Sequence, residues 1–245
     1  MAASDAKTTQ QPTSATPAYV KLHRACLAGC IVLGPLVVLL GFVFDPTGGV
    51  PPAISGIIAD FQAVSPLRIQ LFLFFNAATP FFFPLSYLGL GLLALRRAPW
   101  LSTTGIIVGL VGSLPFAVFV VPEALVAAMA QLGGSNTANV ALWQSTTSQG
   151  AIVFLQFSWV IGHLLGYVLL GIALGRARAI PLWAACLIAL GAPFQAAAYP
   201  THQGVLQILG FALVVIGSIP AALATLKRAG ARTPAHPDEE PVPAA

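Results

Sequence analysis

The feature that most constrains this chain is a series of six long apolar runs, separated by short segments with charged, Pro, Gly and polar residues. The runs lie near 26–44, 69–95, 101–121 with an apolar extension to 130, 151–175, 179–198 and 203–226. A helix needs about 20 apolar residues to cross the hydrocarbon core of a bilayer, and open sheets leave unpaired edges in lipid. The sequence therefore predicts an all-α membrane protein with six transmembrane helices.

The composition excludes other classes of protein. Of the 245 residues, 57% are hydrophobic and 7% are charged, and the mean hydropathy is +0.87. Soluble domains carry about 25% charged residues, so a soluble enzyme is nearly excluded. High hydrophobicity excludes a disordered chain, and three cysteines do not make a disulfide scaffold.

The positive charges predict the orientation, because Lys and Arg are retained on the cytoplasmic side of a membrane. With the N-terminus inside, the outer segments hold only Arg68. The inner segments hold Lys7, Lys21, Arg24, Arg96, Arg97, Arg176, Arg178, Lys227, Arg228 and Arg232. We therefore expect a multi-pass plasma-membrane protein with its N-terminus and C-terminus in the cytoplasm. Topology accounts for the net charge of +4, so no nucleic-acid partner is expected.

The remaining segments divide into tails and loops. Residues 1–20 and 229–245 are rich in Ser, Thr, Gln, Ala and Pro, which predicts disordered cytoplasmic tails on either side of a transmembrane domain at 21–228. In the outer loop 45–68, Ile54, Ile57, Ile58, Phe61 and Val64 recur at helical spacing and predict an interfacial helix. The outer loop 131–149 carries no charge and is expected to be a mobile surface loop.

The second and fourth predicted helices end alike. The shared pattern is Tyr-x3-Gly-x4-Arg, at Tyr87, Gly91 and Arg96 in one copy and at Tyr167, Gly171 and Arg176 in the other. The helix that follows each copy carries a Gly and then a Pro-Phe step, so helices 2–3 and 4–5 are interpreted as a parallel hairpin repeat. The alternative is that any cytoplasmic elbow favours Arg, Pro and an interfacial Trp.

The elbows and a Gly-His step in the fourth helix also suggest a family. Over 87–100 and 162–183 the pattern resembles small six-helix integral membrane proteins of actinobacteria that have no assigned function. The resemblance implies a bacterial plasma-membrane protein, and it brings no catalytic residues with it.

His163 lies at the centre of the fourth predicted helix, and two glutamines share its face. Gln149, Gln156 and His163 are spaced by seven residues, which returns to nearly the same side of a helix. Trp159 and Tyr167 flank this face. A histidine at mid-membrane needs a partner, and we expect it in Glu123, the acidic residue within an apolar run.

Polar side chains are more frequent in the outer half of the predicted bundle than in the inner half. We therefore predict an outward-facing cavity, centred on His163, that binds or transports a small solute. The predicted ligand-binding residues are His163, Gln156, Gln149, Glu123, Asn76, Trp159, Tyr167, Gln207 and His202. The simpler alternative is that His and Gln side chains only hold the helices together through hydrogen bonds.

Two further functions remain open. A non-catalytic accessory or assembly subunit of a membrane complex would use close helix contacts, and Gly162, Gly166, Gly171 and Gly175 are candidates for binding a partner or a second copy. A membrane-embedded metal or haem enzyme would use His163, His202 and Glu123. The sequence has no HExxH motif and no second midplane histidine, so it favours a non-enzyme, and no catalytic residue, metal or cofactor is predicted.

Overall fold

The structure, a computed structural model, describes residues 17–48, 54–132 and 137–227, which contain helices and no strand. The helices are α1 (Ala18–Phe44), α2 (Ile54–Ala63), α3 (Pro66–Ala94), α4 (Pro99–Ser113), α5 (Phe116–Leu132), α6 (Thr137–Thr147), α7 (Gly150–Ala177), α8 (Leu182–Thr201) and α9 (Gly204–Lys227). Six segments are long and apolar enough to span a membrane: α1, α3, α4 with α5, α7, α8 and α9. The prediction of an all-α, six-span membrane protein is confirmed. The predicted tails lie outside the described residues, except that α1 begins at Ala18.

The third span is broken in its middle. α4 ends at Ser113 and α5 begins at Phe116, with Pro115 between them. Proline has no backbone N–H and its ring clashes with the carbonyl four residues earlier, so a helix bends or ends there. As a result α4 packs along α7, whereas α5 packs against α2 and α3.

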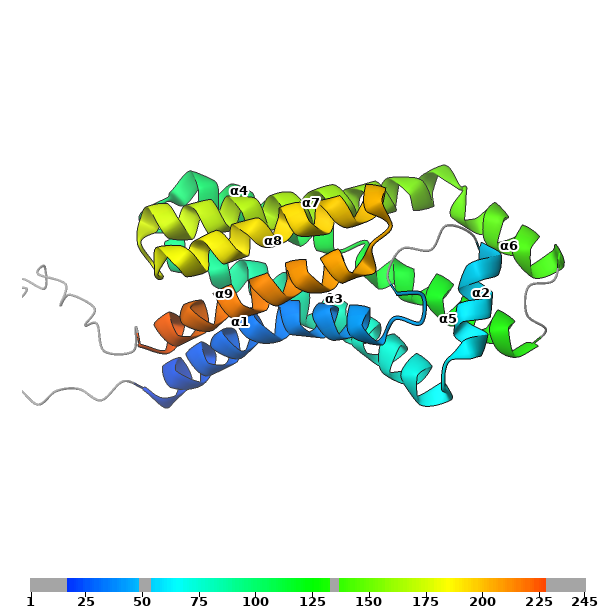
Figure 1. Ribbon diagram of the computed structural model, residues 1–245. Coiled ribbons are helices and arrows are strands. Elements are labelled where there is room, and N and C mark those ends of the chain that lie inside the picture. Colours follow the sequence, from blue (N-terminus) through cyan, green and yellow to red (C-terminus); the bar gives the residue numbers. More distant parts are fainter. Residues whose placement is uncertain (1–16, 49–53, 133–136, 228–245) are drawn as a thin grey trace, which may run out of the picture.

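The two ends of the molecule are formed by different helices (Figure 1). The beginning of α1, the end of α9 and both elbows, α3–α4 and α7–α8, lie together at one end. At this end the Arg97 guanidinium donates a hydrogen bond of 3.1 Å from Nη1 to the carbonyl of Ala177 at the end of α7. At the other end α2, α5, α6 and the start of α3 extend beyond α1, α8 and α9. The duplication of the two hairpins stays a prediction.

Glycine contacts bring α7 close to its neighbours. Gly162 lies against the backbone of Gly112 on α4, and one turn later Gly166 lies against Gly109. Half of the most apolar stretch of α7 is buried, against 33–39% in the other spans. Lipid gives no hydrophobic drive for helices to associate, so close van der Waals contact between small residues supplies much of the attraction.

These contacts correct the prediction of a partner chain for three of the four glycines, whereas for Gly175 it stays a prediction. Gly162 and Gly166 are covered by α4, and Gly171 is covered by Ala185 and Ala189 of α8. A spacing of small residues indicates close packing but does not say whether the neighbour belongs to the same chain.

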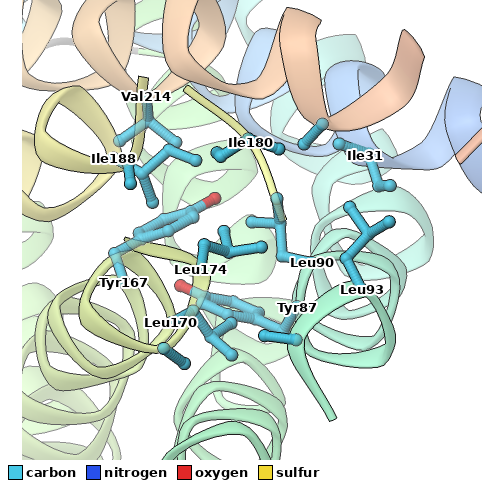
Figure 2. Packing of buried hydrophobic residues seen from close by; sticks show 14 of the residues in the cluster. Ile31, Tyr87, Leu90, Leu93, Tyr167, Leu170, Leu174, Ile180, Ile188 and Val214 are labelled. Atoms are coloured by element: carbon cyan, nitrogen blue, oxygen red, sulfur yellow. The ribbon is translucent and has the colours of Figure 1, made fainter. Parts of the chain in front are cut away.

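The half of the bundle nearer the elbows is close-packed. Figure 2 shows Tyr87 and Tyr167 with the leucines of α3 and α7 around them, and the two ring centroids are 4.7 Å apart. Ile188 of α8 and Val214 of α9 complete this core, and all four side chains are fully buried. Interiors packed in this way have few voids larger than a water molecule.

A second, smaller core holds the other end together. It consists of Ile54, Ile58 and Phe61 of α2, Ile69 and Phe72 of α3, and Val126, Ala127 and Met129 of α5. A helix therefore forms where the sequence predicts one, although α3 and α5 cover its apolar side. Its location at a membrane interface stays a prediction.

The expectation of a mobile loop at 131–149 is wrong for its larger part, because Thr137–Thr147 forms α6. No residue of α6 is buried. Because α6 buries no side chain, its sequence needs no apolar stripe, and at 11 residues it is too short to be recognised by length.

Replacing Gly162 by Leu should destabilise the protein, because any Cβ at this position meets the backbone of Gly112. We expect a loss of about 1–3 kcal/mol, as in other overpacked sites, measured by thermal unfolding in detergent. The matched control is Gly29→Leu, since a Cβ at Gly29 has nothing within 4 Å. Equal melting temperatures for the two variants would contradict the close contact between α4 and α7.

Candidate functional site

His163 lies in the centre of the bundle and is 1% exposed. It is 14 residues before the end of α7 at Ala177, and Gln195 is 13 residues after the start of α8 at Leu182. Because α7 and α8 form a hairpin, both side chains lie about 20 Å from the elbow at 1.5 Å per residue. The two residues therefore face each other at one depth.

Both nitrogens of the imidazole have a hydrogen-bond partner. Nδ1 is 2.6 Å from the carbonyl oxygen of Trp159, and Nε2 is 2.9 Å from Oε1 of Gln195. A carbonyl only accepts hydrogen bonds, so Nδ1 carries a proton. With Oε1 facing Nε2, both contacts are satisfied when the ring carries two protons, whereas a neutral ring requires the Gln195 amide to present its NH₂ group.

Aromatic rings enclose the imidazole on two sides. The Trp159 ring stacks on it with centroids 4.3 Å apart, and the Phe211 ring of α9 lies nearly parallel at 6.2 Å. Phe83 of α3 contacts Trp159 and Phe211 from the side, at 5.5 Å and 6.1 Å. Since Trp159 is 6% exposed and Phe211 is fully buried, His163 is separated from water and lipid.

A polar row continues from His163 toward the end where α8 and α9 meet. The Gln195 Nε2 atom and the Gln207 Oε1 atom are both buried and have no hydrogen-bond partner. Gln195 packs against Gly210 of α9, which follows Gln207 by one turn, and Gln207 faces the hydroxyl of Tyr199. The Gln195 amide thus bonds to the histidine through one of its two polar atoms only.

The side of α7 that carries His163 becomes exposed toward the N-terminus of the helix. Gln156 is exposed although it shares the stripe of the buried His163. The lipid-facing side of α7 is a different one, marked by Phe154, Phe157 and Ile161, which are 53–69% exposed. Because α5 turns away from α7 after Pro115, the side of α7 that carries Gln149 and Gln156 loses the cover that α4 gives further along.

Glu123 lies on the buried side of α5, close in register to Val126 and Ala127. Its Oε2 atom is buried without a hydrogen-bond partner. Since Trp159 and Gln195 occupy both nitrogens of His163, Glu123 is not its partner in this structure.

Asp45 ends α1 and is 8% exposed. Its Oδ1 atom accepts hydrogen bonds from the backbone N–H and the hydroxyl of Thr47, at 2.9 and 2.7 Å. Arg68 donates to the carbonyls of Phe44 and Asp45, at 3.2 and 2.8 Å. Burial raises the pKa of the Asp45 carboxyl above its ordinary value, although the Thr47 hydrogen bonds and the Arg68 charge act in the opposite direction.

Four other predicted site residues lie apart from the His163 imidazole. Asn76 is buried, donates to the carbonyl of Phe72 on its own helix at 3.0 Å, and faces Gly41 of α1. Tyr167 belongs to the close-packed core. Gln149 is exposed at the N-terminus of α7, and His202 is exposed in the turn after α8, with a left-handed φ of 53°. The structure therefore brings together His163 and Trp159, and Gln207 lies on α9 one turn before Phe211, which stacks on His163.

Within the described ranges, no three His, Cys, Asp or Glu side chains gather closely enough to hold a metal ion. A metal site built from His163, His202 and Glu123 therefore has no support from the geometry.

Two residues of the cluster, Gln195 and Phe211, are absent from the predicted site. Gln195 could have been found by counting outward from the α7–α8 elbow, because a hairpin pairs residues at equal distances from its turn. Phe211 has no comparable signal, since a phenylalanine within an apolar run looks the same whether it faces the core or lipid.

Comparisons with models of protein families, with curated proteins and with solved structures give no match. The resemblance to actinobacterial membrane proteins stays a prediction. The function has to be inferred from the residues and their geometry.

A double-mutant cycle tests the pair of His163 and Gln195. His163→Leu, Gln195→Leu and the double variant should show a coupling energy of about 0.6 kcal/mol and at most about 1.7 kcal/mol, the range for hydrogen bonds between membrane helices. The measurement is reversible unfolding of each variant in detergent. Additive effects of the two substitutions would mean that the side chains do not interact.

The stability of the protein should depend on pH through Asp45. Because the folded state raises its pKa, this carboxyl favours folding at acidic pH, and the contribution is lost as pH rises through the raised pKa. Asp45→Asn should remove this part of the pH dependence in thermal unfolding. Asp60→Asn, at an exposed carboxyl, should keep most of it, because burial is the largest cause of the raised pKa and the Asp60 charge the smallest. A stability that rises with pH over this range in the wild type, and not in Asp45→Asn, would contradict the burial of Asp45.

Proposed function

We propose that the protein binds a small polar solute in an outward-facing vestibule between α5 and α7, whose floor is formed by Trp159, His163 and Gln195. The observation that carries the proposal is the exposure of Gln156 on the inward face of α7, one turn from the buried Trp159. In lipid, a polar side chain that faces into a bundle marks a functional or water-accessible position more often than a lipid contact.

The chemistry of the vestibule favours a solute that forms hydrogen bonds with amide groups. Gln149 and Gln156 are exposed on α7, whereas Glu123 lies on the side of α5 that packs against α2 and α3 and is not part of the vestibule. An amide group both donates and accepts hydrogen bonds, so a polar solute can pair with either glutamine.

Transport of the solute is part of the same proposal. The close-packed core around Tyr87 and Tyr167 separates the vestibule from the elbows, so a transport cycle would require the Trp159–His163 floor and this core to open. Such alternating access occurs in transporters whose helices are interrupted by proline, and proline lies within α1, α3, α5, α8 and α9.

The vestibule faces outward if the positive-inside rule holds, because the elbows and the described chain ends lie at the opposite end of the bundle, with Arg96, Arg97, Arg176 and Arg178. Reporter fusions after Arg97 and after Gly175 should therefore report the cytoplasm, and one after His202 the exterior. The reverse pattern would place the vestibule on the cytoplasmic side.

Solute binding can be tested without knowing the ligand. The purified protein is dialysed against a defined mixture of amino acids, polyamines, sugars and nucleosides, and retained compounds are identified by mass spectrometry. We expect retention of at least one compound, and a loss of about five-fold in affinity in Gln156→Leu, the cost of about one hydrogen bond. Phe157→Leu, on the neighbouring lipid-facing position, is the control. If no compound is retained, or both variants behave alike, the polar groups serve only to pack the helices.

A further inference from the structure

A groove lies on the outer surface of the α7–α8 hairpin, near its elbow. It has a volume of about 400 Å³, is open on one side, and is lined chiefly by the small residues Gly171, Gly175, Ala185 and Ala189, with Cys186 and Arg176 at its edges. Small side chains on both helices leave a trough where larger ones would fill the space. At Gly175 a Cβ would meet only Leu182 and Ala185, at ordinary distances of 3.5 and 3.6 Å.

The groove opens toward the lipid. Ile172 and Leu182 line it and are 45% and 69% exposed, as expected for side chains that face the bilayer. The walls are almost wholly apolar, and the charged residue among those that line the groove is Arg176, which is exposed. An apolar trough beside an exposed cation matches a molecule with an apolar chain and an anionic head.

We propose that this groove binds an anionic phospholipid, with an acyl chain along α7 and α8 and the phosphate at Arg176. Guanidinium groups recognise phosphate through paired hydrogen bonds, and basic pockets between membrane helices on the cytoplasmic side bind acidic head groups. Arg97 at the same elbow is engaged with the carbonyl of Ala177, whereas Arg176 is exposed and lines the groove.

A second copy of the chain fits the groove less well. A symmetric dimer across this face would bring the same arginine-bearing ends of two hairpins together, and like charges at an interface oppose association. A lipid phosphate instead supplies a negative charge that pairs with Arg176. The lipid proposal does not depend on solute binding in the vestibule, which lies at the other end of α7.

The test is lipid binding by native mass spectrometry. The purified full chain is titrated in detergent with phosphatidylglycerol and, separately, with phosphatidylcholine. We expect tighter binding of phosphatidylglycerol, and a loss of about five-fold in that preference in Arg176→Gln, as one cation near an anionic lipid contributes. Arg178→Gln, at the same elbow but outside the groove, should keep the preference.

Filling the groove provides a second test. Cys186 is exposed and lines the groove, whereas Cys26 is exposed on α1. Cys186→Phe should weaken phosphatidylglycerol binding, and Cys26→Phe should not. The proposal is overturned if Arg176→Gln and Arg178→Gln give the same preference, or if Cys186 of two copies forms a disulfide whether or not phosphatidylglycerol is present, which would assign the groove to a dimer.

Discussion

The arrangement of this protein depends on the close approach of α4 and α7, where Gly112 meets Gly162 and Gly109 meets Gly166. Because lipid tails are as apolar as the helices, this approach has to be favoured by backbone contact rather than by removal of apolar surface from water. It places α7 inside the bundle and holds His163, the neighbour of Gly162, away from lipid. One turn beyond the contact Pro115 ends the pairing, and α5 leaves α7. The same helix thus has a dry inner part and a more exposed outer part.

The cost of polar groups in a membrane explains how the dry part is built. A buried nitrogen without a partner is expensive, and His163 meets this requirement with the carbonyl of Trp159 and the amide of Gln195. The Gln207 Oε1 and Glu123 Oε2 atoms stay unpaired. A buried polar atom without a partner costs free energy, and a ligand that pairs with it would recover part of that cost.

Much of the architecture could be predicted from the sequence, because span length and the absence of charge are properties of each segment by itself. The stripe of Gln156 and His163 follows from helical periodicity in the same way. What could not be predicted depends on contacts between segments: Gln195 as the partner of His163, and Gly162, Gly166 and Gly171 facing α4 and α8. α6 was missed for a different reason, since a helix without a buried side leaves no apolar period in its sequence.

The most direct test of this account is the water accessibility of α7 along one stripe. In a background with Cys26, Cys30 and Cys186 replaced by Ser, single variants Gln149→Cys, Gln156→Cys, Phe157→Cys and His163→Cys are treated from outside with a membrane-impermeant thiol reagent. We expect rapid labelling at 149 and 156, and none at 157, which faces lipid, or at 163, where the Trp159 ring stacks on the native side chain. Protection of position 156 equal to that of 157, or rapid labelling at 163, would contradict a vestibule that ends above His163.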